Sequence, residues 1–267
     1  MRNIRQQIIT SIHNREMQAA IQPIVDVRDM HWHGVEALAR LNNTTARQLI
    51  QTADSHDLGH IVSLQVLEVT LMTVNDKAIP INFNLSPQQL LNDEVVGGIQ
   101  SLLEQHDYPA KLLTIELTES PSSHSTKNML SALSPLLNSG ARLSLDDFGV
   151  DSQNLQRVLE LPLKQLKIDR SFIRDIHLSG MKQDIVLAII ELTSKYQIEA
   201  ICEGVEKREE SDFLLRHNAH LHQGYLHCKP KLLPYKLNEL SDLHSTFNLE
   251  AIWGGDSLAN NKSSCNI

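Results

Sequence analysis

Short apolar runs and segments of helical periodicity alternate along this chain of 267 residues. Eight runs have the length and residue types of buried strands: IQPIVDV (21–27), HGVEALA (33–39), IPINFNL (79–85), LLTIELT (112–118), ARLSLDD (141–147), LKQLKID (163–169), IEAICEG (198–204) and LHQGYL (221–226). Helical patterns occupy 4–17, 63–75, 97–106, 128–140 and 184–196. Such alternation favours a largely parallel sheet, and eight strands in a chain of this length predict an α/β fold, a TIM-type (β/α)8 barrel.

The first two runs are joined by a short turn near Asp29 rather than by a helical segment. We therefore expect the first strand to be antiparallel to its neighbour. An open, doubly wound sheet is the rival architecture, but no glycine fingerprint follows the first run. The barrel domain is expected to cover residues 1–240, and the polar segment 241–267 is expected to be a loosely ordered tail.

The composition excludes several classes of protein. The net charge is −8 and no long basic run is present, so a nucleic-acid partner is not expected. The N-terminus lacks a signal-peptide pattern, and the apolar run that begins at Ile185 is far shorter than the about 20 residues of a membrane span. We expect a cytoplasmic protein with no membrane partner.

Polar residues stand at the ends of most of the predicted strands. Because chemistry in TIM-type barrels sits where the strands end, these residues are candidates for a common site. The set contains one lysine among oxygen-bearing side chains: Glu36, Asn84, Glu116, Glu119, Asp146, Asp147, Lys167, Asp169, Glu203, Glu206 and Gln223.

So many carboxylates at one mouth would repel each other unless cations lay between them. Carboxylate and amide oxygens are the ligands that Mg²⁺ and Mn²⁺ take, and a pair of such ions about 3.5–4 Å apart is a common device for phosphodiester hydrolysis. A metal pair would also account for the adjacent Asp146 and Asp147. Taken alone, that pair is more often a turn or a helix cap, and Lys167 alone is more often a surface lysine.

Seven sequence blocks resemble those of the EAL domain family of bacterial cyclic di-GMP phosphodiesterases. The blocks occur in the family's order across roughly residues 15–235: GVEALAR (34–40), FNLSPQQL (83–90), IELTES (115–120), LDDFG (145–149), LKIDRSFI (166–173), CEGVE (202–206) and QGYLHCKP (223–230).

The resemblance implies a role for each matching residue. The implied metal ligands, for two Mg²⁺ or Mn²⁺ ions, are Glu36, Asn84, Glu116, Asp146, Asp147 and Glu203. Lys167 would hold the attacking water, Glu203 would act as a base, and Glu119 would steady the loop after the fifth strand. Gln22, Arg40 and Gln223 would contact the substrate, with Arg40 on a phosphate.

The implied reaction is hydrolysis of cyclic di-GMP to linear pGpG by metal-activated water. The resemblance also admits a homodimer and a regulatory protein partner. Two departures keep an alternative open, namely an EAL domain with little or no turnover that binds cyclic di-GMP or a protein. After DDFG the chain reads VDSQN, with Asp151 and Ser152 in place of a glycine and a tyrosine. The segment after Arg40 is also shorter than is usual in the family.

Overall fold

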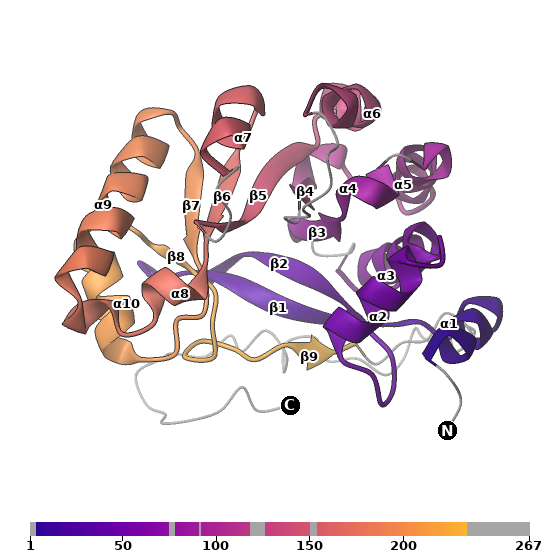
Figure 1. Cartoon of the computed structure of the whole chain (residues 1–267), viewed down its shortest axis with the longest axis horizontal. Helices are drawn as coiled ribbons and strands as arrows, with labels where there is room; N and C mark the ends of the chain where they lie inside the picture. The colour runs from indigo at the N-terminus through magenta and orange to yellow at the C-terminus, as the bar shows by residue number, and fades with distance from the viewer. Residues whose placement is uncertain (1–3, 75–77, 91, 118–125, 150–153, 234–267) are drawn as a thin grey trace.

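In the computed structural model of the chain, a closed barrel of strands is surrounded by helices (Figure 1). The structure describes residues 4–74, 78–90, 92–117, 126–149 and 154–233. The strands are β1 (Gln18–Asp26), β2 (His31–Arg40), β3 (Ile81–Leu85), β4 (Leu113–Leu117), β5 (Arg142–Phe148), β6 (Gln165–Ile168), β7 (Glu199–Cys202), β8 (Leu221–His222) and β9 (Lys231–Leu232). All eight predicted strands are confirmed, and β9 is an addition of two residues that no periodicity could reveal.

Strand pairing closes the sheet into a ring. The order is β2-β3-β4-β5-β6-β7-β8-β1-β9, and a further pairing of β2 with β1 completes the circle. Strands β2 to β8 run parallel to one another, whereas β1 is antiparallel to β2, β8 and β9. The predicted barrel with a reversed first strand is therefore confirmed.

The helices lie outside the barrel and bury their apolar faces against it. The helices that match predicted segments are α1 (Ile4–His13), α3 (Gly59–Val74), α5 (Asp93–Gln105), α6 (Thr126–Asn138) and α9 (Gly180–Lys195). The segment 128–140 ends as expected of a glycine stop. Gly140 has φ +103°, and the N–H groups of Gly140 and Ala141 donate to the carbonyls of Leu137 and Leu136.

Several shorter helices were not predicted from the sequence. They are α2 (Ala46–Asp54), α4 (Pro87–Leu90), α7 (Asn154–Glu160), α8 (Arg170–Ile173) and α10 (Arg208–Arg216), with 3₁₀ turns η2 (Ala110–Leu112) and η3 (Ile176–Leu178). The most consequential is α2, which follows β2 at the barrel mouth. Its start is fixed by a capping box in which Thr45 and Gln48 bond each other's backbone N–H groups.

The inside of the barrel is filled by two kinds of side chain. Ile24, Ile201 and Leu221 form an apolar cluster of their own, separate from the large core between the strands and helices. Asn82, Ser144 and Gln165 are polar and at most 2% exposed. A domain boundary at residue 240 and the tail 241–267 lie outside the described residues. No helix in the described ranges is both long enough and apolar enough to cross a membrane.

Candidate active site

The carboxyl ends of the parallel strands bring the predicted acids together around one lysine. Lys167 on β6 is 1% exposed. Its Nζ lies 2.7 Å from a carboxylate oxygen of Glu203, 3.2 Å from Glu116, 3.3 Å from Asp146 and 3.4 Å from Glu36. We call Lys167 and these four carboxylates the mouth cluster. One cation faces four acids there, so the cluster carries surplus negative charge whenever the acids are ionised.

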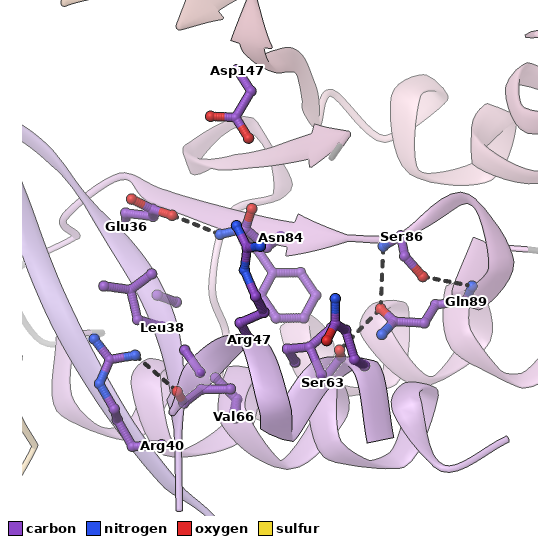
Figure 2. A pocket seen from close by; sticks show the side chains of 16 residues that line it. Glu36, Leu38, Arg40, Arg47, Ser63, Val66, Asn84, Ser86, Gln89 and Asp147 are labelled. Atoms are coloured by element: carbon purple, nitrogen blue, oxygen red, sulfur yellow. Dashed lines mark hydrogen bonds between the residues drawn. The ribbon is translucent and has the colours of Figure 1, made fainter. Parts of the chain in front are cut away.

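Glu36 is the best compensated of these acids. The amide nitrogens of Asn84 and Gln223 each donate to a different carboxylate oxygen of Glu36, both at 2.7 Å. Burial raises the pKa of Glu36, but Lys167 and the two amides outweigh it and leave the pKa below its usual value. Figure 2 shows Glu36 and Asn84 bonded at the edge of a cavity.

The other acids of the site hold their protons more tightly than usual. Burial raises the pKa of Glu203 to about 8, with Asp146 and Glu36 adding repulsion against the attraction of Lys167. Burial likewise raises the pKa of Glu116 and Asp146. Burial and the neighbouring Asp146 raise the pKa of Asp147 to about 6. A bound divalent cation would stabilise the ionised form of these carboxylates and offset their mutual repulsion.

An irregularity in β5 explains how two adjacent aspartates serve one site. Neighbouring residues of a regular strand point to opposite faces. The pairing of β5 with β6 shifts register between Leu145 and Phe148, and Asp147 adopts φ +52°. Asp146, Asp147 and Glu203 consequently each offer a carboxylate oxygen, and these oxygens all lie within 4.8 Å of one another.

The donor set fits a hard divalent cation. Three carboxylate oxygens converge. The amide nitrogen of Gln223 donates to Glu36, and its amide oxygen is buried with no hydrogen-bond partner in the described ranges. Oxygen ligands of this kind suit Mg²⁺ or Mn²⁺. The residues present are therefore compatible with the predicted ions.

Two of the predicted substrate contacts flank this cluster. Gln22 of β1 lies opposite Glu36 in the β1–β2 register, and its amide nitrogen donates to the carbonyl of Cys228 at 3.1 Å. Arg40, at the end of β2, donates to the carbonyl of Ala39 at 2.8 Å. Figure 2 shows Arg40 at the side of the cavity remote from Asp147. Glu119 and the variant residues Asp151 and Ser152 lie outside the described residues.

Two cavities open beside the mouth cluster. One, of about 510 Å³, lies between β2, β3, α2 and α3 and includes Arg40 and Phe83 in its lining (Figure 2). The other, of about 620 Å³, lies toward β7 and β8 and includes Tyr225. Both are lined by Glu36, Asp147 and Arg47, so these three residues mark the boundary between them.

Arg47 is a candidate that the sequence analysis missed. It stands in the first turn of α2, is exposed, and forms no ion pair within the ranges that the structure describes. Figure 2 shows its side chain pointing from α2 toward Asn84. The pattern Thr45-x-x-Gln48 could have predicted the helix start and hence an arginine near the mouth.

The histidines near β8 have structural partners. His222 is fully buried, and its ring nitrogens lie 3.2 Å from the hydroxyl of Ser211 and 3.0 Å from the carbonyl of Ala219. Its ring centroid is 5.5 Å from that of His227. Burial lowers the pKa of both His222 and His227 to about 4. This pair is thus kept neutral by the fold at ordinary pH.

The fold is a closed barrel with one reversed strand, and the mouth of this barrel is acidic and suited to a divalent cation. The model of the EAL domain family matches residues 2–230. The chain belongs to the EAL domain family.

The relatives and solved structures agree with this assignment. PdeR, a cyclic di-GMP phosphodiesterase of Escherichia coli K12, is 30% identical over 214 residues, which are 74% of this chain and 32% of PdeR. The chain thus spans about a third of the length of that relative.

Two solved structures are similar along most of the described barrel. The PaMucR phosphodiesterase in complex with cyclic di-GMP is 27% identical with a TM-score of 0.75, covering 85% of this chain and 97% of that chain. BlrP1 of Klebsiella pneumoniae in a manganese and cyclic di-GMP complex is 25% identical with a TM-score of 0.72, covering 81% and 56%. The BlrP1 structure thus holds cyclic di-GMP together with manganese, and the PaMucR structure holds cyclic di-GMP.

Proposed function

We propose that this chain is a divalent-metal-dependent phosphodiesterase that hydrolyses cyclic di-GMP to linear pGpG. The observation that carries the proposal is the mouth cluster, in which two buried and two partly buried carboxylates share one lysine beside the further carboxylate of Asp147. The printed activity of PdeR and the cyclic di-GMP bound in the PaMucR and BlrP1 structures support the choice of substrate.

Metal ions at this site would be held by Glu36, Asn84, Glu116, Asp146, Asp147 and Glu203. When bound, Mg²⁺ or Mn²⁺ would make water acidic enough to attack phosphorus and would offset charge on the phosphoryl oxygens.

The protein's own groups would carry the proton and the charge. The surrounding acids outweigh burial and raise the pKa of Lys167 well above its usual value, so its Nζ stays protonated and can donate to an oxygen that gains charge. The pKa of Glu203 is about 8 without metal, and a bound cation would hold this carboxylate in its ionised form, from which it could accept a proton from the attacking water.

The two cavities would each receive one half of the substrate. Cyclic di-GMP contains two guanosine units joined by two phosphates, so a cleaved phosphate at the boundary would place one guanosine on either side. Arg47 at that boundary would bind a phosphate, as would Arg40 within the smaller cavity. Gln22 and Gln223 would contact the half that lies toward β8.

The test is incubation of the purified chain with cyclic di-GMP and Mg²⁺ or Mn²⁺, followed by chromatography for pGpG. We expect product with either ion and none with a chelator. No product above that of an Asp146→Ala control would overturn the enzymatic proposal.

The alternative is an EAL domain that binds cyclic di-GMP or a protein without turnover. The sequence departures at Asp151 and Ser152 and after Arg40 favour it. Micromolar binding of cyclic di-GMP without pGpG formation would support this alternative. A homodimer and a regulatory protein partner stay predictions.

A further inference from the structure

A chain of hydrogen bonds runs through the barrel from the mouth cluster to the opposite end. Residues two apart on a strand share a face, so Asn82 stands below Asn84, Gln165 below Lys167, and Glu199 four residues before Glu203. Four residues of strand span about 13 Å. Glu199, at the start of β7, therefore lies far from the reacting groups and close to Arg142, the first residue of β5.

Each contact in this chain is short and buried or half-buried. The Asn82 amide nitrogen donates to Glu116 and to the Gln165 amide oxygen, both at 2.7 Å. The Gln165 amide nitrogen donates to Glu199 at 3.0 Å. The same Glu199 oxygen accepts from Arg142 and lies 3.3 Å from the His33 ring nitrogen. We call His33, Arg142 and Glu199 the lower cluster.

The charge on Glu199 determines which way the side-chain amides of Gln165 and Asn82 face. A carboxylate can only accept hydrogen bonds, so Gln165 must turn its nitrogen toward Glu199 and its oxygen toward Asn82. Asn82 must then present its nitrogen to Gln165, and the second hydrogen of that nitrogen reaches Glu116. If Asn82 turned over, its oxygen would face the carboxylate of Glu116, which is 0% exposed and has no water to separate the two.

We propose that Glu199 is a positioning residue for the active site, acting through Gln165 and Asn82 to hold the carboxylate of Glu116 in place. The inference rests on the proposed function, in which Glu116 is a metal ligand. Groups that orient a ligand from behind commonly alter metal affinity 10–100-fold when they are changed. Because Glu199 acts through two intermediates, we expect the lower end of that range.

The test is a double-mutant cycle with Mn²⁺ affinity as the readout, measured on the full chain by the electron paramagnetic resonance of free Mn²⁺. Glu199→Gln removes the charge that orients the side-chain amides of Gln165 and Asn82. Gln165→Met interrupts the chain of hydrogen bonds with a side chain of similar length. Each single variant should weaken Mn²⁺ binding about 10-fold, and the double variant should be no weaker than either single one.

Arg142→Met is the matched control. It removes the outer partner of Glu199 but keeps the carboxylate, so it should lower the melting temperature and leave Mn²⁺ affinity within about 2-fold of the parent. Multiplying effects in the double variant, or parent-like affinity in Glu199→Gln or Gln165→Met, would overturn the proposal.

A second measurement separates the inference from the proposed function. The side-chain NH₂ resonance of Asn82, identified by its loss in Asn82→Ser, should shift in Gln165→Met and Glu199→Gln but not in Arg142→Met. An unchanged resonance in folded Gln165→Met would overturn the positioning role even if Glu199→Gln fails to fold. Failure of the parent chain to bind Mn²⁺ would instead defeat the proposed function, and the Asn82 resonance would still decide the positioning role.

Discussion

The mouth cluster and the lower cluster are both built on acids inside the same barrel, yet their charges are handled in opposite ways. At the lower end Glu199 faces two basic side chains. Its contacts with His33, Gln165 and Arg142 outweigh burial and lower its pKa to about 2. At the mouth four acids face Lys167 alone, and burial raises the pKa of Glu203 to about 8.

The difference separates an acid that stabilises the fold from acids that are held ready for a ligand. A compensated carboxylate contributes favourable contacts in the free protein. Uncompensated carboxylates destabilise the folded state when no metal is bound, and a bound cation stabilises it again. The two clusters thus predict opposite responses to the same kind of substitution.

Neutralising one acid in each cluster should produce the largest difference between the two clusters, in turnover and in thermal stability. Asp146→Asn should lower cyclic di-GMP turnover by about 10³-fold or more, because a lost metal ligand removes several kcal/mol of transition-state stabilisation. It should not lower the melting temperature of the metal-free protein, since burial already disfavours the charge on Asp146. Turnover by pGpG chromatography and thermal unfolding in a chelator measure the two effects.

Glu199→Gln is the counterpart in the lower cluster. It should destabilise the fold by roughly 1–2 kcal/mol, a value discounted because the Glu199 side chain is 34% exposed. A marked loss of stability in Asp146→Asn together with none in Glu199→Gln would contradict the assignment of roles.

The pH dependence of the unfolding free energy should also differ between the two clusters. The pKa of Glu203 is raised from 4.5 to about 8, so the folded state holds a proton that the unfolded state has lost, and stability must fall as pH rises toward 8. Between pH 6.5 and 8, His222 and His227 act in the opposite direction, because their pKa is 6.5 in the unfolded state and about 4 in the folded state. As the unfolded state loses these histidine protons, roughly 0.4 kcal/mol of stability is regained per histidine. We therefore expect the metal-free protein to show a net loss of roughly 1 kcal/mol over this interval.

Denaturant unfolding at several pH values measures this decline. The decline should largely disappear in Glu203→Gln, which cannot titrate. Mn²⁺ should stabilise the parent more at pH 8 than at pH 6.5, because ligands must lose their protons to bind metal. A metal-free parent that gains stability from pH 6.5 to 8 would rule out the surplus charge inferred at the mouth.

The lower cluster has the opposite sign and a more acidic window. Glu199 has its pKa lowered from 4.5 to about 2, so its contribution is complete above pH 4.5 and is lost as pH falls to 2. The stability difference between the parent and Glu199→Gln should accordingly be constant above pH 4.5 and shrink below it.

The arginines of the two regions offer a smaller contrast. Arg47 at the mouth forms no ion pair within the described ranges, whereas Arg142 is bonded to Glu199. Arg47→Ala should raise the KM for cyclic di-GMP about 10-fold through a lost phosphate contact, and change stability by no more than about 0.5 kcal/mol. Arg142→Met should lower stability and leave KM near the parent value. The reverse pattern would show that Arg47 belongs to the fold rather than to the substrate site.

The sequence predicted the mouth well because a simple geometric rule applies there. Parallel strands end at one edge of a barrel, so Glu36, Glu116, Asp146, Lys167 and Glu203 had to converge once the strands were recognised. What the rule could not give is the bulge that turns Asp147 toward the same site, since that depends on the pairing of β5 with β6.

The lower cluster was missed although its signal is present in the sequence. Arg142, Ser144 and Asp146 alternate on β5, as Gln165 and Lys167 do on β6, which places each set on one face. Which polar residues meet across the barrel depends on strand stagger and on the bulge near His33 in the β1–β2 pairing. Arg47 was missed for another reason, because the short segment after Arg40 was interpreted as a shortened loop rather than as a capped helix.

Ser144, halfway between the two clusters on β5, provides the smallest and most local test. Its hydroxyl is buried with no hydrogen-bond partner in the described part of the chain, so it is linked to neither cluster. Ser144→Ala removes an unsatisfied polar atom and should raise the unfolding free energy by up to about 1 kcal/mol. Turnover and Mn²⁺ affinity should stay within about 2-fold of the parent. A 10-fold loss of Mn²⁺ affinity would instead mean that Ser144 joins the hydrogen-bond chain from Glu199, so that the clusters communicate by a second route.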